Sequence, residues 1–103
     1  MASSKEYLNY VSEQLSDLEG VTYRAMMGEY IIYYGGKVIG GIYDNRFLVK
    51  QTKASKALLF DAPLELPYEG AKEMLLVDVD NRELLNELIP QIANDLPEPK
   101  KKS

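Results

Sequence analysis

Tyrosine, lysine and arginine gather in one stretch of this sequence, and together they can bind nucleic acid or protein. Residues 22–50 contain five of the eight tyrosines and five of the seven glycines. Aromatic rings on a sheet surface with cations beside them can stack bases and hold single-stranded nucleic acid. Tyrosine is also common at protein interfaces, because it tolerates partial exposure to water. The candidate partner-binding residues are Tyr30, Tyr34, Lys37, Tyr43, Arg46 and Lys50.

The charge of the chain favours a protein partner over nucleic acid. Residues 1–96 carry 9 basic and 15 acidic side chains, which gives this part a net charge of −6. A net-acidic body repels phosphate backbones unless its positive charges gather on one face. We therefore expect contact with another protein or with a second copy of the chain in a homodimer. A nucleic-acid-binding module that uses the tyrosine, lysine and arginine residues is the alternative.

A second candidate site combines Arg24 with Gly28. A fixed guanidinium group beside a glycine could hold a carboxylate or a phosphate through two hydrogen bonds. Arg24 could instead pair with Glu29 or cap the end of a helix, and such ionic contacts often serve structure alone. We favour the structural interpretation.

The residue types that perform most catalysis and metal binding are absent. The chain has no cysteine and no histidine, which removes thiolate sites, the commonest general base and the commonest metal ligand. Carboxylate groups remain at Asp78 and Asp80, and at Glu65, Glu69 and Glu73, and such groups can hold a hard cation or run acid–base chemistry. None of them lies in a recognisable ligand pattern. The sequence therefore predicts no enzyme, no cofactor and no metal, with a carboxylate-based enzyme as a distant alternative.

The elements that must position these residues begin with a helix over residues 3–20. Apolar residues recur there at steps of three or four, Ser3 and Glu6 fit a capping box, and Gly20 is placed to end the helix. A short helix is expected over residues 53–60, an ordered loop over 61–70 and a buried strand over 73–79. A last helix follows, with Asp80 as its cap and Pro90 as a kink or a break.

Two short turns set the register of the strands between the first two helices. Gly35–Gly36 and Asp44–Asn45 each suit a two-residue hairpin turn. With regular pairing, Ile32 opposes Ile39, Ile42 opposes Phe47 and Gly41 opposes Leu48. The side chains then sort onto two faces. One face is then apolar and core-facing, with Ile31, Tyr33, Val38, Gly40, Ile42, Phe47 and Val49. The other face holds all six candidate partner-binding residues.

The element order predicts a two-layer α+β sandwich with an antiparallel sheet: helix, about four meander strands, helix, strand, helix. A length of 103 residues suits one domain, which we place at residues 1–96, with residues 97–103 as a flexible basic tail. No window reaches the roughly 20 apolar residues that cross a bilayer, and the amino terminus lacks the pattern of a signal peptide. We therefore expect no membrane contact and a cytoplasmic location.

The stretch from Arg24 to Lys50 resembles the amino-terminal domain of the competence regulator TfoX, also called Sxy. The positions that match the family pattern are Arg24, Met26, Met27, Gly28, Tyr30, Tyr33, Gly36, Asp44, Leu48 and Lys50. Pro67–Tyr68 and the segment MLLVDVDNRELL are similar to later parts of the same family. The resemblance implies a stand-alone copy of that domain, a fold like that of secretion chaperones, and a role in transcription regulation.

Overall fold

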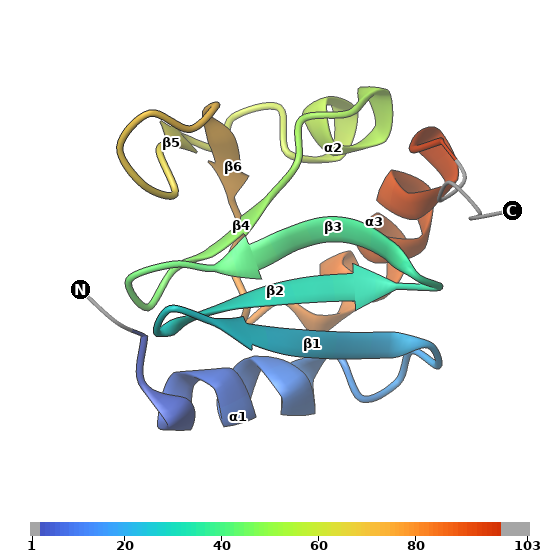
Figure 1. Cartoon of the computed structure of the whole chain (residues 1–103). Helices are drawn as coiled ribbons and strands as arrows, with labels where there is room; N and C mark the ends of the chain where they lie inside the picture. The colour runs from blue at the N-terminus through green and yellow to red at the C-terminus, as the bar shows by residue number, and fades with distance from the viewer. Residues whose placement is uncertain (1–2, 98–103) are drawn as a thin grey trace, which may run out of the picture.

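A computed structural model of the chain describes residues 3–97, which form a six-stranded antiparallel sheet and three helices (Figure 1). The strand order is β1-β2-β3-β4-β6-β5. The elements along the chain are α1 (Lys5–Gln14), β1 (Val21–Met26), β2 (Glu29–Tyr34), β3 (Lys37–Ile42), β4 (Phe47–Val49), α2 (Lys53–Leu58), β5 (Leu64–Glu65), β6 (Met74–Leu76) and α3 (Arg82–Asp95).

The core lies between one face of the sheet and the helices α1 and α3. Its fully buried members include Val11 of α1, Ile42 and Phe47 of the sheet, and Leu88 and Ile92 of α3. α2 packs against α3. This arrangement confirms the predicted two-layer α+β class, and it leaves the other face of the sheet without a covering helix (Figure 1).

Both long helices begin one residue later than the sequence predicts. Ser4, not Ser3, caps α1, because its hydroxyl accepts a hydrogen bond from the Tyr7 backbone at 3.1 Å. The hydroxyl of Ser3 instead donates to the Glu29 carboxylate at 2.6 Å. Asn81, not Asp80, caps α3, and its side chain accepts from the Leu84 backbone.

Three further predictions about element bounds are wrong in detail. The first helix ends at Gln14, and Gly20, with a φ of 92°, serves the turn into β1. The predicted loop over 61–70 contains the short strand β5, which pairs with β6. α3 runs from Arg82 to Asp95 as one helix with Pro90 inside it, so the break considered at Pro90 does not occur. The short helix α2 is confirmed, and Thr52 and Ser55 form its capping box.

The hairpins of the meander close through pairs of residues with positive φ. The two predicted turns, Gly35–Gly36 and Asp44–Asn45, both have this conformation, and so does a third turn at Met27 (φ 53°) and Gly28 (φ 86°). Positive φ at both central residues defines the primed turn whose twist matches a hairpin. The turns therefore fix the alignment of each strand with the next at its closed end.

A β-bulge in β3 makes the predicted β2–β3 register wrong from Ile39 onward. Tyr33 pairs with Val38 as expected, but Ile32 pairs with Gly40, so Ile39 is the extra residue. Side chains alternate between the two faces along a strand. One extra residue therefore moves the residues on one side of the bulge to the opposite face from the one that regular pairing predicts. Ile31, Tyr33 and Val38 therefore lie on the open face, while Ile32 is buried in the core.

Gly40 and Gly41, adjacent in β3, are each too close to a neighbour to carry a side chain, and the neighbour differs between them. A Cβ on Gly40 would lie 2.2 Å from the Leu48 carbonyl oxygen, so the backbone of β4 leaves no room for a side chain there. A Cβ on Gly41 would lie 2.6 Å from the ring of Tyr43 and 2.7 Å from the Tyr30 carbonyl oxygen. Close backbone approach at Gly40 and a covering side chain at Gly41 thus explain why both positions are glycine.

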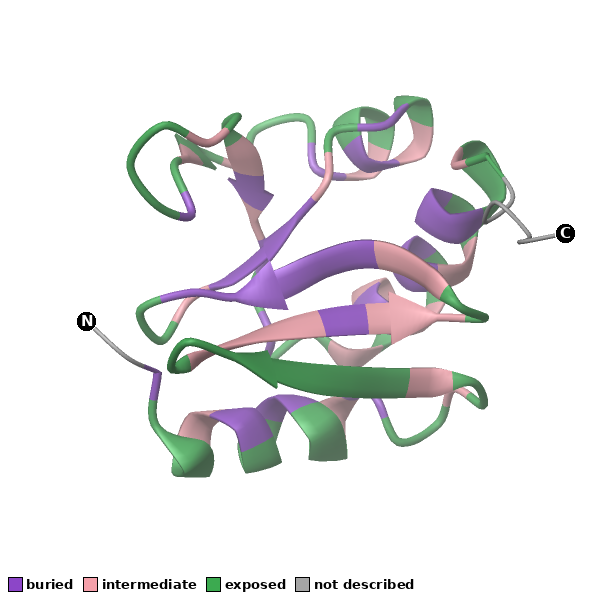
Figure 2. Ribbon diagram, viewed as in Figure 1, coloured by how far each residue is buried: buried purple, intermediate pink, exposed green. Residues whose placement is uncertain are grey.

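Among the strands of the central meander, β1 is the most exposed (Figure 2). Within residues 3–97, no helix is long and apolar enough to cross a membrane.

Candidate functional site

The six residues predicted to share one binding face are divided by the bulge. Tyr30, Tyr34 and Lys37 lie on the helix side of the sheet, where both tyrosines pack against the core. The Lys37 amino group donates to the carbonyl oxygens of Ala93 at 2.9 Å and Leu96 at 3.1 Å. A lysine placed at the carboxyl end of a helix satisfies carbonyl groups that lack intrahelical partners. The single tyrosine-and-cation face is therefore a wrong prediction.

Arg46 lies at the closed end of the β3–β4 hairpin and connects it to the second edge of the sheet. Its guanidinium group donates to the Glu65 carboxylate at 2.5 Å and to the Leu66 carbonyl oxygen at 3.0 Å. Its Nε donates to the Tyr43 carbonyl oxygen at 3.1 Å. The planar arginine fork suits several fixed acceptors at once. Arg46 thus holds the segment after β5 against the hairpin.

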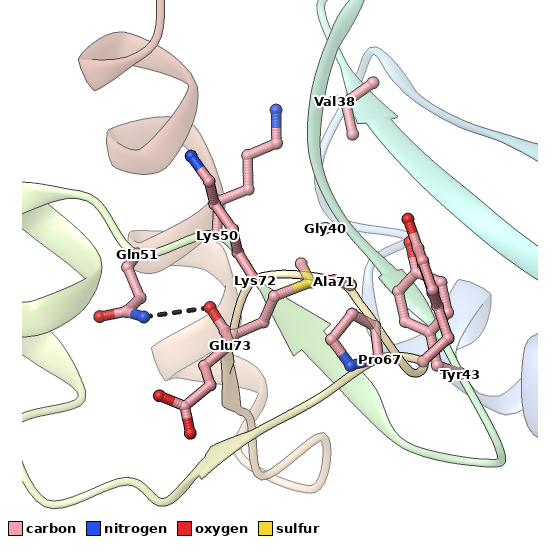
Figure 3. A pocket seen from close by; sticks show the side chains of 11 residues that line it. Val38, Gly40, Tyr43, Lys50, Gln51, Pro67, Ala71, Lys72 and Glu73 are labelled. Carbon is pink, nitrogen blue, oxygen red and sulfur yellow. Dashed lines mark hydrogen bonds between the residues drawn. The ribbon is translucent and has the colours of Figure 1, made fainter.

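Tyr43 and Lys50 help to line a pocket of about 480 Å³ on the open face (Figure 3). Val38 and Gly40 contribute from β3, and the β5–β6 connection supplies the opposite wall. That wall consists of Pro67, Tyr68, Ala71, Lys72, Glu73 and Met74. The volume falls within the range of pockets that bind small molecules or single side chains, about 300–1,000 Å³. This pocket is the candidate functional site.

Two tyrosine rings line the pocket and lie close together. The centroids of the Tyr43 and Tyr68 rings lie 6.0 Å apart and their planes are tilted by 54°. Tyr43 is only 8% exposed whereas Tyr68 is 61% exposed. Burial raises the pKa of the Tyr43 phenol, with smaller contributions from Tyr68 and Glu29. The Tyr43 hydroxyl therefore stays protonated at neutral pH and can donate a hydrogen bond.

Two cations and one carboxylate surround the remaining side. In the part of the chain that the structure describes, neither Lys50 nor Lys72 has a hydrogen bond or ion pair from its amino group. The backbone carbonyl of Glu73 accepts a hydrogen bond from the Gln51 amide at 3.0 Å. Figure 3 shows the Glu73 carboxylate pointing away from both amino groups. The pocket thus offers positive charge beside aromatic and aliphatic surface.

The predicted pair of Arg24 and Gly28 does not form a local structural clamp. Arg24 is exposed in the middle of β1, opposite Ile31. The Glu29 carboxylate, its expected partner, accepts instead from Ser3 and from the Asp44 backbone. Gly28 belongs to the first hairpin turn, and its carbonyl oxygen accepts from the Ser3 backbone at 3.0 Å. A structural role is therefore clear for Gly28.

The carboxylates considered for chemistry serve several separate contacts. Asp80 accepts a short hydrogen bond from the Tyr10 hydroxyl, and the Asp78 side chain accepts from the Asp80 backbone. Glu65 is paired with Arg46. No group of three or more acidic, histidine or cysteine side chains within residues 3–97 is arranged to hold a metal ion. The three terminal lysines lie outside the described residues.

Sequence reasoning missed the second wall of the pocket. Tyr68 comes from the segment predicted as an ordered loop, Lys72 lies between that loop and the predicted strand, and Met74 lies in the strand. These residues lie near β3 because β4 pairs with β6, and no local sequence pattern predicts that pairing. The one available signal was the Pro67–Tyr68 match to the TfoX pattern.

The fold is a two-layer α+β domain with a pocket on its open sheet face. The chain belongs to the TfoX N-terminal domain family, whose model matches residues 13–86. It is also 33% identical over 102 residues to the "Uncharacterized 12.7 kDa protein in trpE 5'region" of Spirochaeta aurantia. That match covers 97% of this chain and 89% of the relative. No solved structure matches the chain.

Proposed function

We propose that this chain is a non-enzymatic regulatory or adaptor domain that binds an acidic segment of a partner protein in the open-face pocket. In this proposal, one apolar side chain of the partner enters the pocket beside Tyr43 and Tyr68. Acidic residues next to that anchor meet the amino groups of Lys50 and Lys72. Membership of a family named for a regulator is consistent with this role.

The observation that carries the proposal is the combination of unpaired cations with an aromatic pocket on an uncovered sheet face. Interfaces concentrate their binding energy in a few aromatic and cationic residues around a desolvated pocket. Lys50 and Lys72 add charge complementarity, which selects acidic partners and speeds encounter. The pocket volume of about 480 Å³ accommodates one large side chain with room for its neighbours.

Exposed apolar residues extend the surface beyond the pocket. Phe60, Leu64, Leu66 and Tyr68 are 83%, 45%, 47% and 61% exposed, within one short segment of the chain. Arg46 fixes this segment through its contacts with Glu65 and Leu66. Large apolar side chains exposed close together in a fixed segment often mark a protein interaction site. The surface therefore suits a peptide that passes from the pocket along the β5 edge.

Selection from a phage-displayed library of random peptides tests the proposal with a defined probe. Wild-type protein should enrich peptides that carry an aromatic or large aliphatic residue flanked by Asp or Glu. The double variant K50E/K72E should lose these peptides, because its pocket repels their acidic residues. Enrichment of no motif, or of the same motif by both proteins, would refute the proposal.

A matched control separates the pocket from general surface charge. The double variant K53E/K56E makes the same charge change on α2, whose two lysines do not line the pocket. It should retain the selected peptides with affinity within about twofold of wild type, since exposed charges outside the pocket lining contribute little. Equal loss of binding in both double variants would show a nonspecific effect of net charge and would contradict the pocket.

The competing nucleic-acid hypothesis is tested with oligo(dT) and oligo(U) at low salt. Binding of phosphate backbones weakens steeply as salt rises, because it depends on counterion release. The proposal predicts no saturable binding of either oligonucleotide. Saturable, salt-sensitive binding that K50E/K72E abolishes would assign the pocket to nucleic acid instead.

A further inference from the structure

β1 is an open edge of the sheet along its whole length. It is the first strand in the sheet order and pairs only with β2. Thr22 through Met26 are all exposed, and Tyr23 is 51% exposed (Figure 2). An unpaired strand edge presents backbone donors and acceptors that can pair with another chain.

The register of the first hairpin identifies which backbone groups point outward. Met26 and Glu29 flank the two-residue turn and are paired, and such a flanking pair exchanges hydrogen bonds in a primed hairpin. Bonded and non-bonded pairs alternate along an antiparallel ladder. The N–H and C=O groups of Val21, Tyr23 and Ala25 therefore point away from β2. No described residue forms a hydrogen bond with them.

β1 carries few of the features by which proteins block such edges. Very short strands, prolines, bulges and charged side chains are the usual protective devices. β1 has six residues, a regular register with β2, no proline and one charged residue, Arg24. The opposite edge strand, β5, has only two residues. The two edges therefore differ in their capacity to pair.

We infer that β1 pairs antiparallel with the β1 strand of a second copy of this chain, with Tyr23 opposite Tyr23 at the two-fold axis. In this register, Val21 of each copy lies opposite Ala25 of the other copy. All three outward-pointing residues of each copy then exchange hydrogen bonds. The two sheets become one continuous sheet.

Side chains make this register better than its neighbours. Arg24 of each copy lies opposite Thr22 of the other, so no like charges meet. A shift of the axis to Arg24 would set two guanidinium groups opposite each other, which is unfavourable. A shift of the axis to Thr22 would leave Ala25 opposite residue 19, which lies outside the strand. The centroids of the Tyr23 and Tyr30 rings lie 5.9 Å apart. The Tyr23 ring of the second copy would cover the exposed side of the Tyr23 ring of the first.

A single engineered cysteine tests the register, because the chain contains no native cysteine. Paired residues in a bonded pair have Cα atoms about 5.5 Å apart, within the range of a disulfide. Tyr23→Cys should therefore form a disulfide-linked dimer under mild oxidation. Thr22→Cys is the control, because its two copies lie roughly 8 Å apart by strand spacing and rise, which is too far for a disulfide.

Dimerisation of the native chain is measured by light scattering and sedimentation over a concentration series. The wild type should associate reversibly, and Ala25→Pro should raise the dissociation constant on the order of tenfold or more, because it removes two hydrogen bonds and crowds the edge. The β1–β2 ladder stays intact, since the Ala25 N–H points outward. Circular dichroism confirms that the variant is folded.

Two results would overturn the inference. One is a strict monomer up to about 1 mM, the limit of weak specific affinity. The other is a dimer that Ala25→Pro leaves unchanged or that crosslinks equally through Thr22→Cys. Peptide selection at the pocket uses different residues, so failure of one proposal does not decide the other.

Discussion

The guanidinium group of Arg46 lies 2.5 Å from the Glu65 carboxylate and joins the β3–β4 hairpin to β5. These residues are 19 positions apart in the sequence, and both side chains are about two-thirds shielded from water. Because Arg46 also binds the Leu66 carbonyl oxygen, it fixes the start of the connection that carries Pro67 and Tyr68. The pocket wall is therefore positioned by an ion pair at its base.

Replacing Arg46 with lysine should loosen this wall. An ammonium group cannot reproduce the planar fork that reaches three acceptors. The free energy of unfolding should fall by about 1 kcal/mol, a value reduced for the partial exposure of the pair, as measured by urea denaturation. Arg24→Lys is the control, because Arg24 is exposed and has no partner among the described residues. Equal stability of the two variants would contradict a positioning role for Arg46.

Substitution of Lys37 distinguishes a helix cap from a binding residue. Lys37→Met keeps the aliphatic chain but removes the donor to the Ala93 and Leu96 carbonyl oxygens. We expect a loss of about 1 kcal/mol in unfolding free energy and unchanged affinity for selected peptides. A variant with native stability but weaker peptide binding would restore the original sequence prediction for this residue.

Gly41→Ala should destabilise the sheet by forcing Tyr43 out of position. The added methyl group would lie 2.6 Å from the Tyr43 ring and 2.7 Å from the Tyr30 carbonyl oxygen. Overpacking of this kind costs about 1–3 kcal/mol. The same substitution in a Tyr43→Ala background should cost less, because one of the two clashes is removed. An identical cost in both backgrounds, measured by thermal or urea unfolding, would show that the Tyr43 ring does not lie over Gly41.

The raised pKa of Tyr43 predicts a loss of stability at high pH. Burial raises the pKa of this phenol above its ordinary value of 10.0. The folded state therefore binds the proton more tightly than the unfolded state does, and its contribution is complete below pH 10.0. That contribution is lost as pH rises through the higher pKa of the folded state. The free energy of unfolding of the wild type, measured in urea, should fall more steeply above pH 10 than that of Tyr43→Phe. Parallel curves would be evidence against the burial of this hydroxyl.

Local patterns in the sequence predict most of the fold. Apolar periodicity locates the three helices, and the paired residues at Gly35–Gly36 and Asp44–Asn45 locate two hairpins. The predicted β3–β4 register is confirmed, with Ile42 opposite Phe47 and Gly41 opposite Leu48. These features depend on residues that are close together in the chain.

The site is less predictable because it depends on one inserted residue and on long-range pairing. The bulge at Ile39 reverses the faces of Tyr30, Tyr34 and Lys37 relative to Tyr43 and Lys50. The sequence offers a hint in the adjacent glycines, but not the position of the extra residue. The second wall of the pocket depends on the β4–β6 pairing. Pairing between distant strands is set by the whole fold rather than by local composition.

The most direct test of the pocket is a two-dimensional NMR titration with an acidic peptide that contains one central phenylalanine. The method detects affinities even in the millimolar range. We predict saturable shifts at Val38, Tyr43, Lys50, Tyr68 and Lys72, and much smaller ones for a peptide with alanine in place of phenylalanine. Shifts confined to the helix side around Tyr30 and Tyr34, or equal shifts with both peptides, would contradict the account.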